Sequence, residues 1–414
     1  MDPFLYSLFV LFAGFFMFFQ KRPFSLASLM YVGVLLYGMP LFFGETEFVT
    51  SYLQSMTYLE PLNETLYYSH IIILLFSVLI SIKINHTSTK PLVFSDFLSL
   101  KVLVVFQVIY TCMFLIDVGP GPILGRDKDY LVANASVFYF FASYSSIILL
   151  NWLILKREIS NWPYAVFPSL FLLIDLYVGY RTNFFLGICS FIISYGFHFK
   201  EIRFGQRLLL VVGAFSFAMF AFIYKAIVYS IEVGGIDNLQ FITPTTFKGS
   251  EPFIVMGSFN EIINQNISVP AEFNFSLLFQ YIPLGEAILG VEKFSFNSLL
   301  QNQLFPETEW GIASTGLGSL YISGGFWAII LYGLFLFFLS YVIYKQKSAM
   351  IAALLISFSP YVFFYFYRND WFHGIGVFKL MIFSLIPYFA FCFSRESLEI
   401  FRKILRGESV WGVQ

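Results

Sequence analysis

The chain has 414 residues, of which 58% are hydrophobic and 12% are charged, and its formal net charge is −1. Soluble domains carry roughly a quarter charged residues, so this composition excludes an ordinary soluble protein and indicates an integral membrane protein. The near-zero net charge gives no reason to expect a nucleic acid partner. The three cysteines, Cys112, Cys189 and Cys392, lie in apolar runs, which favours packing roles over a disulfide frame or a zinc cluster.

Apolar runs of about the length that a bilayer core requires recur along the whole chain. The sequence predicts eleven spans, at residues 3–19, 24–43, 66–82, 101–117, 135–155, 163–178, 184–199, 208–224, 316–344, 350–367 and 375–393. The first run has no basic stretch before it and no small-residue cleavage pattern after it, so it is interpreted as a retained span. The expected fold class is an all-α polytopic membrane protein that forms a single integral-membrane domain over residues 1–414.

Basic residues concentrate in alternate loops and in the tail at residues 394–414. These loops hold Lys21, Arg22, Lys83, Lys90, Lys101, Lys156, Arg157, Lys200, Arg203, Arg207, Lys345 and Lys347, and the tail holds Arg395, Arg402, Lys403 and Arg406. Because basic residues in short loops stay on the cytoplasmic side, the carboxyl terminus is predicted to be cytoplasmic and the amino terminus to lie outside.

A single long loop, at residues 225–312, follows the eighth span on the outer side. Loops without internal structure are rarely longer than about 15 residues. Aromatic residues are spread through this loop among Glu, Asn and Gln. That composition favours folded interfacial helices lying over the bundle and not a disordered tether.

Arg181 is the most informative residue, because it and Asp175 are the only charges between Pro163 and Phe199. A guanidinium stays charged at ordinary pH and is costly at membrane depth unless water or an anion solvates it. Asp175 lies six residues away, which is not the spacing of helical neighbours. Arg181 is therefore a candidate catalytic residue and Asn183 a candidate substrate-binding residue at the same level, although a bridge from Arg181 to another span remains an alternative.

Further outer cations occur at Arg126 and Lys225, both candidate substrate-binding residues. Arg126 follows a Gly/Pro-dense turn that begins at Gly119, where backbone N–H groups can join the guanidinium in binding a phosphate oxyanion. The alternative is an exposed loop in which Arg126 pairs with Asp127 or Asp129.

The short outer turn after the tenth span carries Arg368, Asp370, Trp371 and His373 within six residues. Arg368 is a candidate cation for catalysis and His373 a candidate proton carrier, since imidazole titrates near neutrality. Asp370 and Trp371 are candidate substrate-binding residues. Aromatic side chains also occur at any membrane interface, and His373 has the alternative of a plain hydrogen-bonded role.

Carboxylates and small residues lead into the ninth span. Glu307 and Glu309 are candidates for a general base that activates a hydroxyl nucleophile. The small residues from Gly316 to Gly325 permit close backbone approach, either to another helix or to a ligand beside Tyr321, which is a candidate substrate-binding residue.

Together these features resemble the oligosaccharide repeat-unit polymerases of the O-antigen (Wzy) type. The resemblance rests on about eleven spans, the Gly-rich turn from Gly119 to Tyr130, the Gly-Tyr-Arg-Thr sequence that ends at Thr182, a large late outer loop, and residues 314–321 with the following Gly324-Gly325. It implies a GT-C-like helical bundle with one large periplasmic loop, in the bacterial inner membrane. It also implies glycosyl transfer from undecaprenyl pyrophosphate to another lipid-linked unit, without cofactor or metal.

The partners implied are lipid-linked oligosaccharides, the lipid bilayer, a chain-length regulator and a flippase. Related ligases place a histidine where this chain has Ser314 and Thr315, which favours a polymerase over an O-antigen ligase. A flippase for lipid-linked glycans is the alternative, but it would need charges along several spans, and here the spans hold almost none besides Asp175. A non-catalytic assembly protein is a third alternative, for which the outer arginines would be dispensable.

Overall fold

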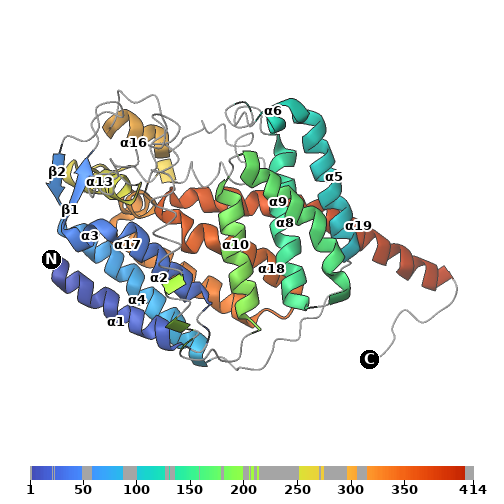
Figure 1. The fold of residues 1–414 in the computed structure, drawn as a ribbon, viewed down its shortest axis with the longest axis horizontal. Helices are drawn as coiled ribbons and strands as arrows, with labels where there is room; N and C mark the ends of the chain where they lie inside the picture. The colour runs from blue at the N-terminus through green and yellow to red at the C-terminus, as the bar shows by residue number, and fades with distance from the viewer. Residues whose placement is uncertain are drawn as a thin grey trace. The chain divides into compact units, whose positions relative to one another are not determined.

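The computed structural model describes residues 2–20, 22, 24–48, 58–86, 100–125, 130, 136–157, 159–178, 181–198, 205, 207–208, 212–213, 251–269, 272–274, 296–304 and 315–405 (Figure 1). These residues are mostly helical and belong to two compact units. Unit 1 combines Met1–Pro91, Gly196–Lys345 and Tyr361–Ile375, and unit 2 combines Leu92–Tyr195, Gln346–Pro360 and Gly376–Gln414. Each unit therefore gathers segments that are far apart in the sequence.

Unit 1 contains α1 (Pro3–Phe19), α2 (Leu26–Tyr37), α3 (Met39–Phe43), β1 (Glu45–Phe48), β2 (Tyr58–Pro61), α4 (Glu64–His86), α13 (Glu251–Asn264), α16 (Phe296–Leu304), α17 (Gly316–Lys345) and η3 (Tyr365–Tyr367). Unit 2 contains α5 (Leu100–Val118), α6 (Pro120–Leu124), α8 (Val137–Lys156), η1 (Ile159–Ala165), α9 (Val166–Val178) and most of α10 (Arg181–Gly196). Besides α10, whose last residue belongs to unit 1, two helices contribute to both units. α18 (Ala349–Phe363) belongs to unit 2 as far as Pro360, and α19 (Trp371–Leu405) belongs to unit 1 as far as Ile375.

Six helices in the described part of the chain are long and apolar enough to cross a bilayer: Glu64–Ile84, Leu100–Val118, Val137–Lys156, Gly316–Lys345, Ala349–Tyr367 and Trp371–Ser394. Shorter apolar helices cover Pro3–Phe19, Leu26–Tyr37 and Thr182–Gly196. The chain is therefore a helical, multi-pass membrane protein, as its composition predicts. The number of eleven spans stays a prediction, since most of the expected span at 208–224 lies outside the described residues.

Unit 1 packs around α4, which contacts α1, α2 and α17 (Figure 1). Leu66, Ile73 and Ile80 of α4 are fully buried and recur every two turns, so they line one face of the helix. Gly333 allows α17 to approach α4 closely, because a Cβ at this position would lie 2.1 Å from the Phe76 ring. Small residues at helix contacts are the usual means of close packing in membranes.

The predicted span at 24–43 is divided at Gly38, which separates α2 from α3. The Gly38 N–H bonds to the Val34 carbonyl at 2.7 Å and ends α2, and Pro40 lies in the first turn of α3, where its missing N–H is tolerated. A Cβ at Gly38 would lie 2.5 Å from the Tyr6 hydroxyl oxygen. This glycine is thus required by the close approach of α1.

A small two-stranded antiparallel sheet, β1–β2, lies in the first predicted outer loop, within a fold that is otherwise helical as expected. The sheet and the residues that follow it hold α13 in place. The Thr46 hydroxyl donates to the Phe253 carbonyl at 2.8 Å. Asn260 accepts from the Asn63 N–H at 2.9 Å and donates to the Pro61 carbonyl at 3.2 Å.

The long loop contains α13 and α16, which confirms for these residues that the loop folds into helices. α13 differs from the interfacial helix expected, because nearly every side chain from Pro252 to Ile263 is buried. It contacts α2, α3, α4 and α17, so it is enclosed by unit 1 and does not lie on the surface of a bundle. α16 packs beside it through Phe296, Leu300 and Leu304, which share an apolar cluster with Ile262.

The small residues at the start of α17 serve helix packing, one of the two roles that the sequence left open. A Cβ at Gly316 would lie 2.1 Å from the Phe366 carbonyl oxygen, and one at Gly318 would lie 2.9 Å from Ile262. α17 is bent at Gly324 and Gly325. Gly325 has φ 59° and ψ −147°, a conformation that essentially only glycine adopts.

In unit 2, Asn151 of α8 joins three helices through hydrogen bonds. Its Nδ2 donates to Ser190 of α10 and to Ser357 of α18, each at 2.8 Å, and its Oδ1 accepts from Ser194 at 2.7 Å. All four side chains are fully buried. Because unpaired polar groups are costly in an apolar interior, this set fixes the register of the three helices.

The close packing of α17 predicts that Gly316→Ala destabilises the protein. We expect a loss of about 1–3 kcal/mol, because the new methyl group overlaps backbone atoms that cannot rotate away. The measurement is the midpoint of thermal unfolding in detergent. Gly121→Ala is the matched control, since nothing lies within 4 Å of the Cβ position there. Equal midpoints for the two variants would show that Gly316 is not closely packed.

Candidate functional site

The turn between α18 and α19 and the first turn of α19 carry four of the residues that the sequence singles out, and all four belong to unit 1. α18 ends at Phe363, and the single 3₁₀ turn η3 leads to Arg368. α19 then begins at Trp371. The turn therefore presents Arg368 and Asp370 between two helices that are long and apolar enough to cross a bilayer.

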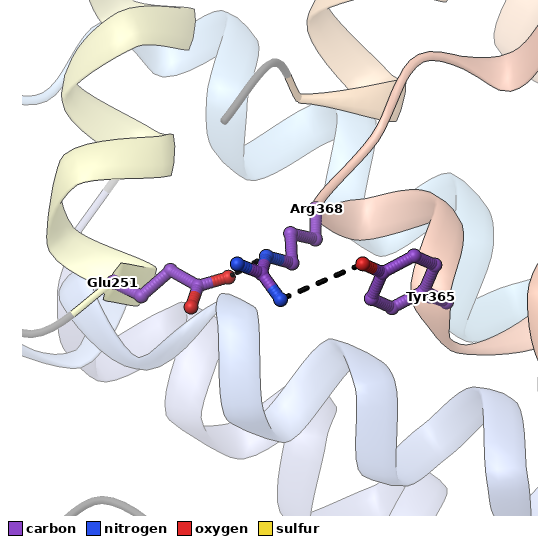
Figure 2. A network of polar contacts seen from close by, with 3 residues as sticks. All are labelled: Glu251, Tyr365 and Arg368. Atoms are coloured by element: carbon purple, nitrogen blue, oxygen red, sulfur yellow. Dashed lines mark hydrogen bonds and ion pairs between the residues drawn. The ribbon is translucent and has the colours of Figure 1, made fainter. Parts of the chain in front are cut away.

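Arg368 forms an ion pair with Glu251, whose carboxylate comes from the first turn of α13 (Figure 2). Arg368 Nε lies 2.6 Å from Glu251 Oε1. On its other side the guanidinium donates through Nη1 to the Tyr365 hydroxyl at 3.5 Å, and it lies 5.7 Å from the centre of the Tyr365 ring. Figure 2 shows the guanidinium between the carboxylate and this hydroxyl. The cation is thus held by one anion and one aromatic side chain.

Both members of the pair remain accessible, with 36% of the Arg368 side chain and 28% of the Glu251 side chain exposed. Burial lowers the pKa of Arg368, but the Glu251 carboxylate, followed by the Tyr365 and Tyr37 hydroxyls, raises this pKa to a value above the ordinary one. The guanidinium therefore stays charged at all ordinary pH values. Tyr37 stacks on Tyr367, with ring centroids 5.7 Å apart, which places α2 beside the same site.

Asp370 is the N-cap of α19. Its Oδ1 accepts a hydrogen bond from the His373 backbone N–H at 2.8 Å, which is the usual contact between an N-cap and the third helical residue. Burial raises the pKa of Asp370, while hydrogen bonds from backbone N–H groups, that of His373 first, act in the opposite direction. The structure thus gives Asp370 a capping role, and its role in substrate binding stays a prediction.

The side chains of His373, Trp371 and Tyr321 lie near the same turn. The His373 ring lies 5.9 Å from the Tyr365 ring, the ring that contacts Arg368. The Trp371 backbone N–H donates to Ser319 of α17 at 3.3 Å, while its buried indole nitrogen has no hydrogen-bond partner. Tyr321 and Trp371 both pack against the apolar cluster around α16. His373 therefore lies beside the ring that contacts Arg368, while Trp371 and Tyr321 pack against the apolar cluster around α16.

The other predicted site residues belong to unit 2 or lie outside the described residues. Asn183 belongs to unit 2, where it donates to the Tyr139 hydroxyl at 3.4 Å. Arg181 is the first residue of α10, also in unit 2, and its side chain is outside the description. Four further candidates lie outside the described residues, namely Arg126, Lys225, Glu307 and Glu309.

Glu251 and Tyr365 are the site residues that the sequence reading did not select. Glu251 lies far from Arg368 in the chain, and no spacing rule connects the two. One signal was available, since Glu251 and Pro252 stand immediately before an apolar run, which is typical of the first turn of a helix. That signal locates the carboxylate on a helix but does not identify its partner.

The arrangement suits recognition of an anion beside a carboxylate. Arg368 can donate to phosphate or carboxylate oxygens, and Glu251 can accept a proton or a hydrogen bond. Within the described ranges, no group of three or more His, Cys, Asp or Glu residues is placed to hold a metal ion.

Comparisons of the chain with protein-family models, with curated proteins and with solved structures find no match. The class of protein is therefore defined by the fold alone, as a helical multi-pass membrane protein with a partly exposed arginine–carboxylate pair between two spans. Any more specific function must be argued from the residues of this site.

The capping role of Asp370 predicts a difference between two substitutions. Asp370→Asn keeps an oxygen that can accept the His373 N–H, so we expect unfolding within about 0.5 kcal/mol of the wild type, whereas Asp370→Ala loses about 1 kcal/mol. Thermal unfolding of both variants in detergent provides the measurement. If Asp370→Asn removed activity while leaving stability intact, Asp370 would have a chemical role beyond the cap.

Proposed function

We propose that the chain polymerises lipid-linked oligosaccharide repeat units of O-antigen or a similar surface polysaccharide. The reaction would be glycosyl transfer from undecaprenyl pyrophosphate on the periplasmic face of the bacterial inner membrane. The observation that carries the proposal is the Arg368–Glu251 pair, because it provides a permanent cation, a carboxylate and solvent access between two spans. The resemblance in sequence layout to repeat-unit polymerases supports the same conclusion.

The leaving group of this reaction is a lipid pyrophosphate, which lies at the boundary of the bilayer. Its departure needs positive charge to stabilise the phosphate oxygens, and a preorganised guanidinium provides this without a metal ion. Arg368 has the required charge, partial exposure and position at the end of a span. Tyr365 contacts the guanidinium on the side opposite to Glu251. Arg368 therefore keeps its contact with Tyr365 when the pyrophosphate replaces Glu251.

Glu251 occupies the place at Arg368 that a phosphate oxygen would take. In the proposed reaction the donor pyrophosphate displaces the carboxylate from the guanidinium, and the released Glu251 accepts the proton of the acceptor hydroxyl. The hydroxyl oxygen then bonds to the anomeric carbon of the donor sugar. The bond from that carbon to the pyrophosphate oxygen breaks, and its electron pair leaves with the pyrophosphate.

The proposal includes the finer features expected from the sequence. These are eleven spans in a GT-C-like bundle, a periplasmic amino terminus and a cytoplasmic carboxyl terminus. Arg181, Arg126 and Lys225 are retained as further cations for the lipid pyrophosphate. His373, Glu307 and Glu309 are retained as further proton acceptors, and a chain-length regulator and a flippase are retained as partners.

The first test is the glycan ladder of cells that produce Arg368→Ala or Arg368→Lys at wild-type protein level. Because the guanidinium would stabilise the leaving group, we expect polymer to fall about 100-fold in Arg368→Ala, leaving a single-unit product. Arg368→Lys should recover only part of the ladder, since an ammonium does not reproduce the planar set of donors. The ladder is measured by gel electrophoresis of extracted glycan.

Lys347→Ala is the control for removal of a charge, because Lys347 is exposed and distant in sequence from the turn. Its ladder should match that of the wild type. An unchanged ladder in Arg368→Ala would remove Arg368 from the reaction. Loss of the single-unit product on the outer face would indicate an export function instead of polymerisation.

If the donor pyrophosphate displaces Glu251 from Arg368, replacing Glu251 should strengthen donor binding and slow turnover. Glu251→Gln removes the competing charge at Arg368, so we expect KM for the lipid-linked donor to fall while kcat falls at least tenfold, because the proton acceptor is lost. The measurement is initial rate against donor concentration for purified protein in vesicles. A rise in KM with unchanged kcat would mean that Glu251 only positions Arg368.

A further inference from the structure

Unit 2 contains a buried carboxyl, Asp175, in the helix α9. Only 3% of this residue is exposed. Phe171, one turn earlier on the same helix, packs in an apolar cluster with Phe114 and Tyr139. Asp175 is therefore an acidic side chain in aromatic and aliphatic surroundings within a membrane protein.

The hydrogen bonds of Asp175 come from a neutral partner. The Tyr139 hydroxyl of α8 donates to Asp175 Oδ1 in a short contact. Asn183 of α10 in turn donates to the Tyr139 hydroxyl oxygen at 3.4 Å. Asp175 Oδ2 is buried and has no hydrogen-bond partner. The carboxyl group thus has one satisfied oxygen and one unsatisfied oxygen.

An ionised carboxylate in these surroundings would have no cation among the described side chains to balance its negative charge. No lysine or arginine forms an ion pair with Asp175 in the part of the chain that the structure describes. An unpaired buried charge costs several kcal/mol or more, and such a group avoids this cost by taking up a proton. A metal cation is a poor alternative occupant, since Na⁺ or Ca²⁺ needs several oxygen ligands and Tyr139 is the described side chain that contacts the carboxyl.

Buried polar side chains continue along α8 from Tyr139. Tyr139, Ser143 and Ser146 are spaced by four and three residues, so they lie on one face of the helix over about 10 Å. Ser143 Oγ is buried without a hydrogen-bond partner. Gln107 of α5 donates to Ser146 at 3.1 Å, and its Oε1 is also unpaired. Buried polar side chains therefore recur along the face of α8 that begins at Tyr139, the hydrogen-bond partner of Asp175.

We propose that Asp175 is a proton-binding site in the interior of unit 2, with the proton on its carboxyl group and Tyr139 as the hydrogen-bond donor that holds that group. Ser143 and Gln107 are the next polar groups along the proton path. This site is separate from the Arg368–Glu251 pair, and the glycosyl transfer proposed there does not use it. The inference therefore stands independently of the proposed function.

The test is infrared difference spectroscopy of the purified full-length protein at neutral pH, wild type minus Asp175→Asn. The proposal predicts that the difference contains the C=O stretching band of one protonated carboxylic acid, shifted in D₂O. Tyr139→Phe should retain this band and move it to higher frequency, because the carbonyl oxygen loses its hydrogen bond. As a reference, Glu251→Gln should remove a carboxylate band, since Glu251 pairs with a cation.

Loss of a carboxylate band in Asp175→Asn, in place of a carboxylic acid band, would overturn the proposal. The substitution preserves side-chain shape, and a thermal unfolding midpoint close to that of the wild type confirms an intact fold. If Asp175→Asn does not fold, the Tyr139→Phe spectrum decides. A carboxylic acid band that moves in this variant supports the proposal, and a moved carboxylate band contradicts it.

Discussion

The charge on Arg368, which lies between two candidate membrane spans, must be balanced, and the arrangement of unit 1 around the turn serves this constraint. The balancing carboxylate of Glu251 reaches the guanidinium only because α13 is enclosed in unit 1. Hydrogen bonds from Thr46 and Asn260 hold that helix beside the small sheet. Gly316 lets α17 approach the turn that carries Arg368. The packing of α13 and α17 therefore brings Arg368 and Glu251 close enough to form their ion pair.

The two units surround a carboxyl group with different neighbours. Glu251 is partly exposed and pairs with Arg368, and in our proposal another anion takes its place there. Asp175 is almost fully buried and meets a tyrosine hydroxyl, so in our account it holds a proton. The first environment suits binding of a charged substrate, and the second suits storage or transfer of a proton.

Sequence patterns predicted the helical membrane fold, because the length and hydrophobicity of each run are local properties. They also located Arg368, Asp370 and His373 on one turn. They did not predict that Gly38 divides a span, that a small sheet precedes α4, or that α13 is enclosed, since each depends on contacts between distant segments. The Glu251 partner of Arg368 was missed for the same reason. The role of Asp370 was open to prediction, because an aspartate immediately before an apolar helix is a common N-cap.

The central claim is that Arg368 receives the pyrophosphate leaving group during glycosyl transfer. It is tested most directly with purified protein in vesicles that contain lipid-linked single repeat units. The quantity to measure is the polyprenyl pyrophosphate released for each glycosidic bond formed. The account predicts polymer with one pyrophosphate lipid released per bond, and neither product when Arg368 is replaced by alanine. Movement of intact lipid-linked units across the membrane without polymer, at an equal rate in both proteins, would contradict it.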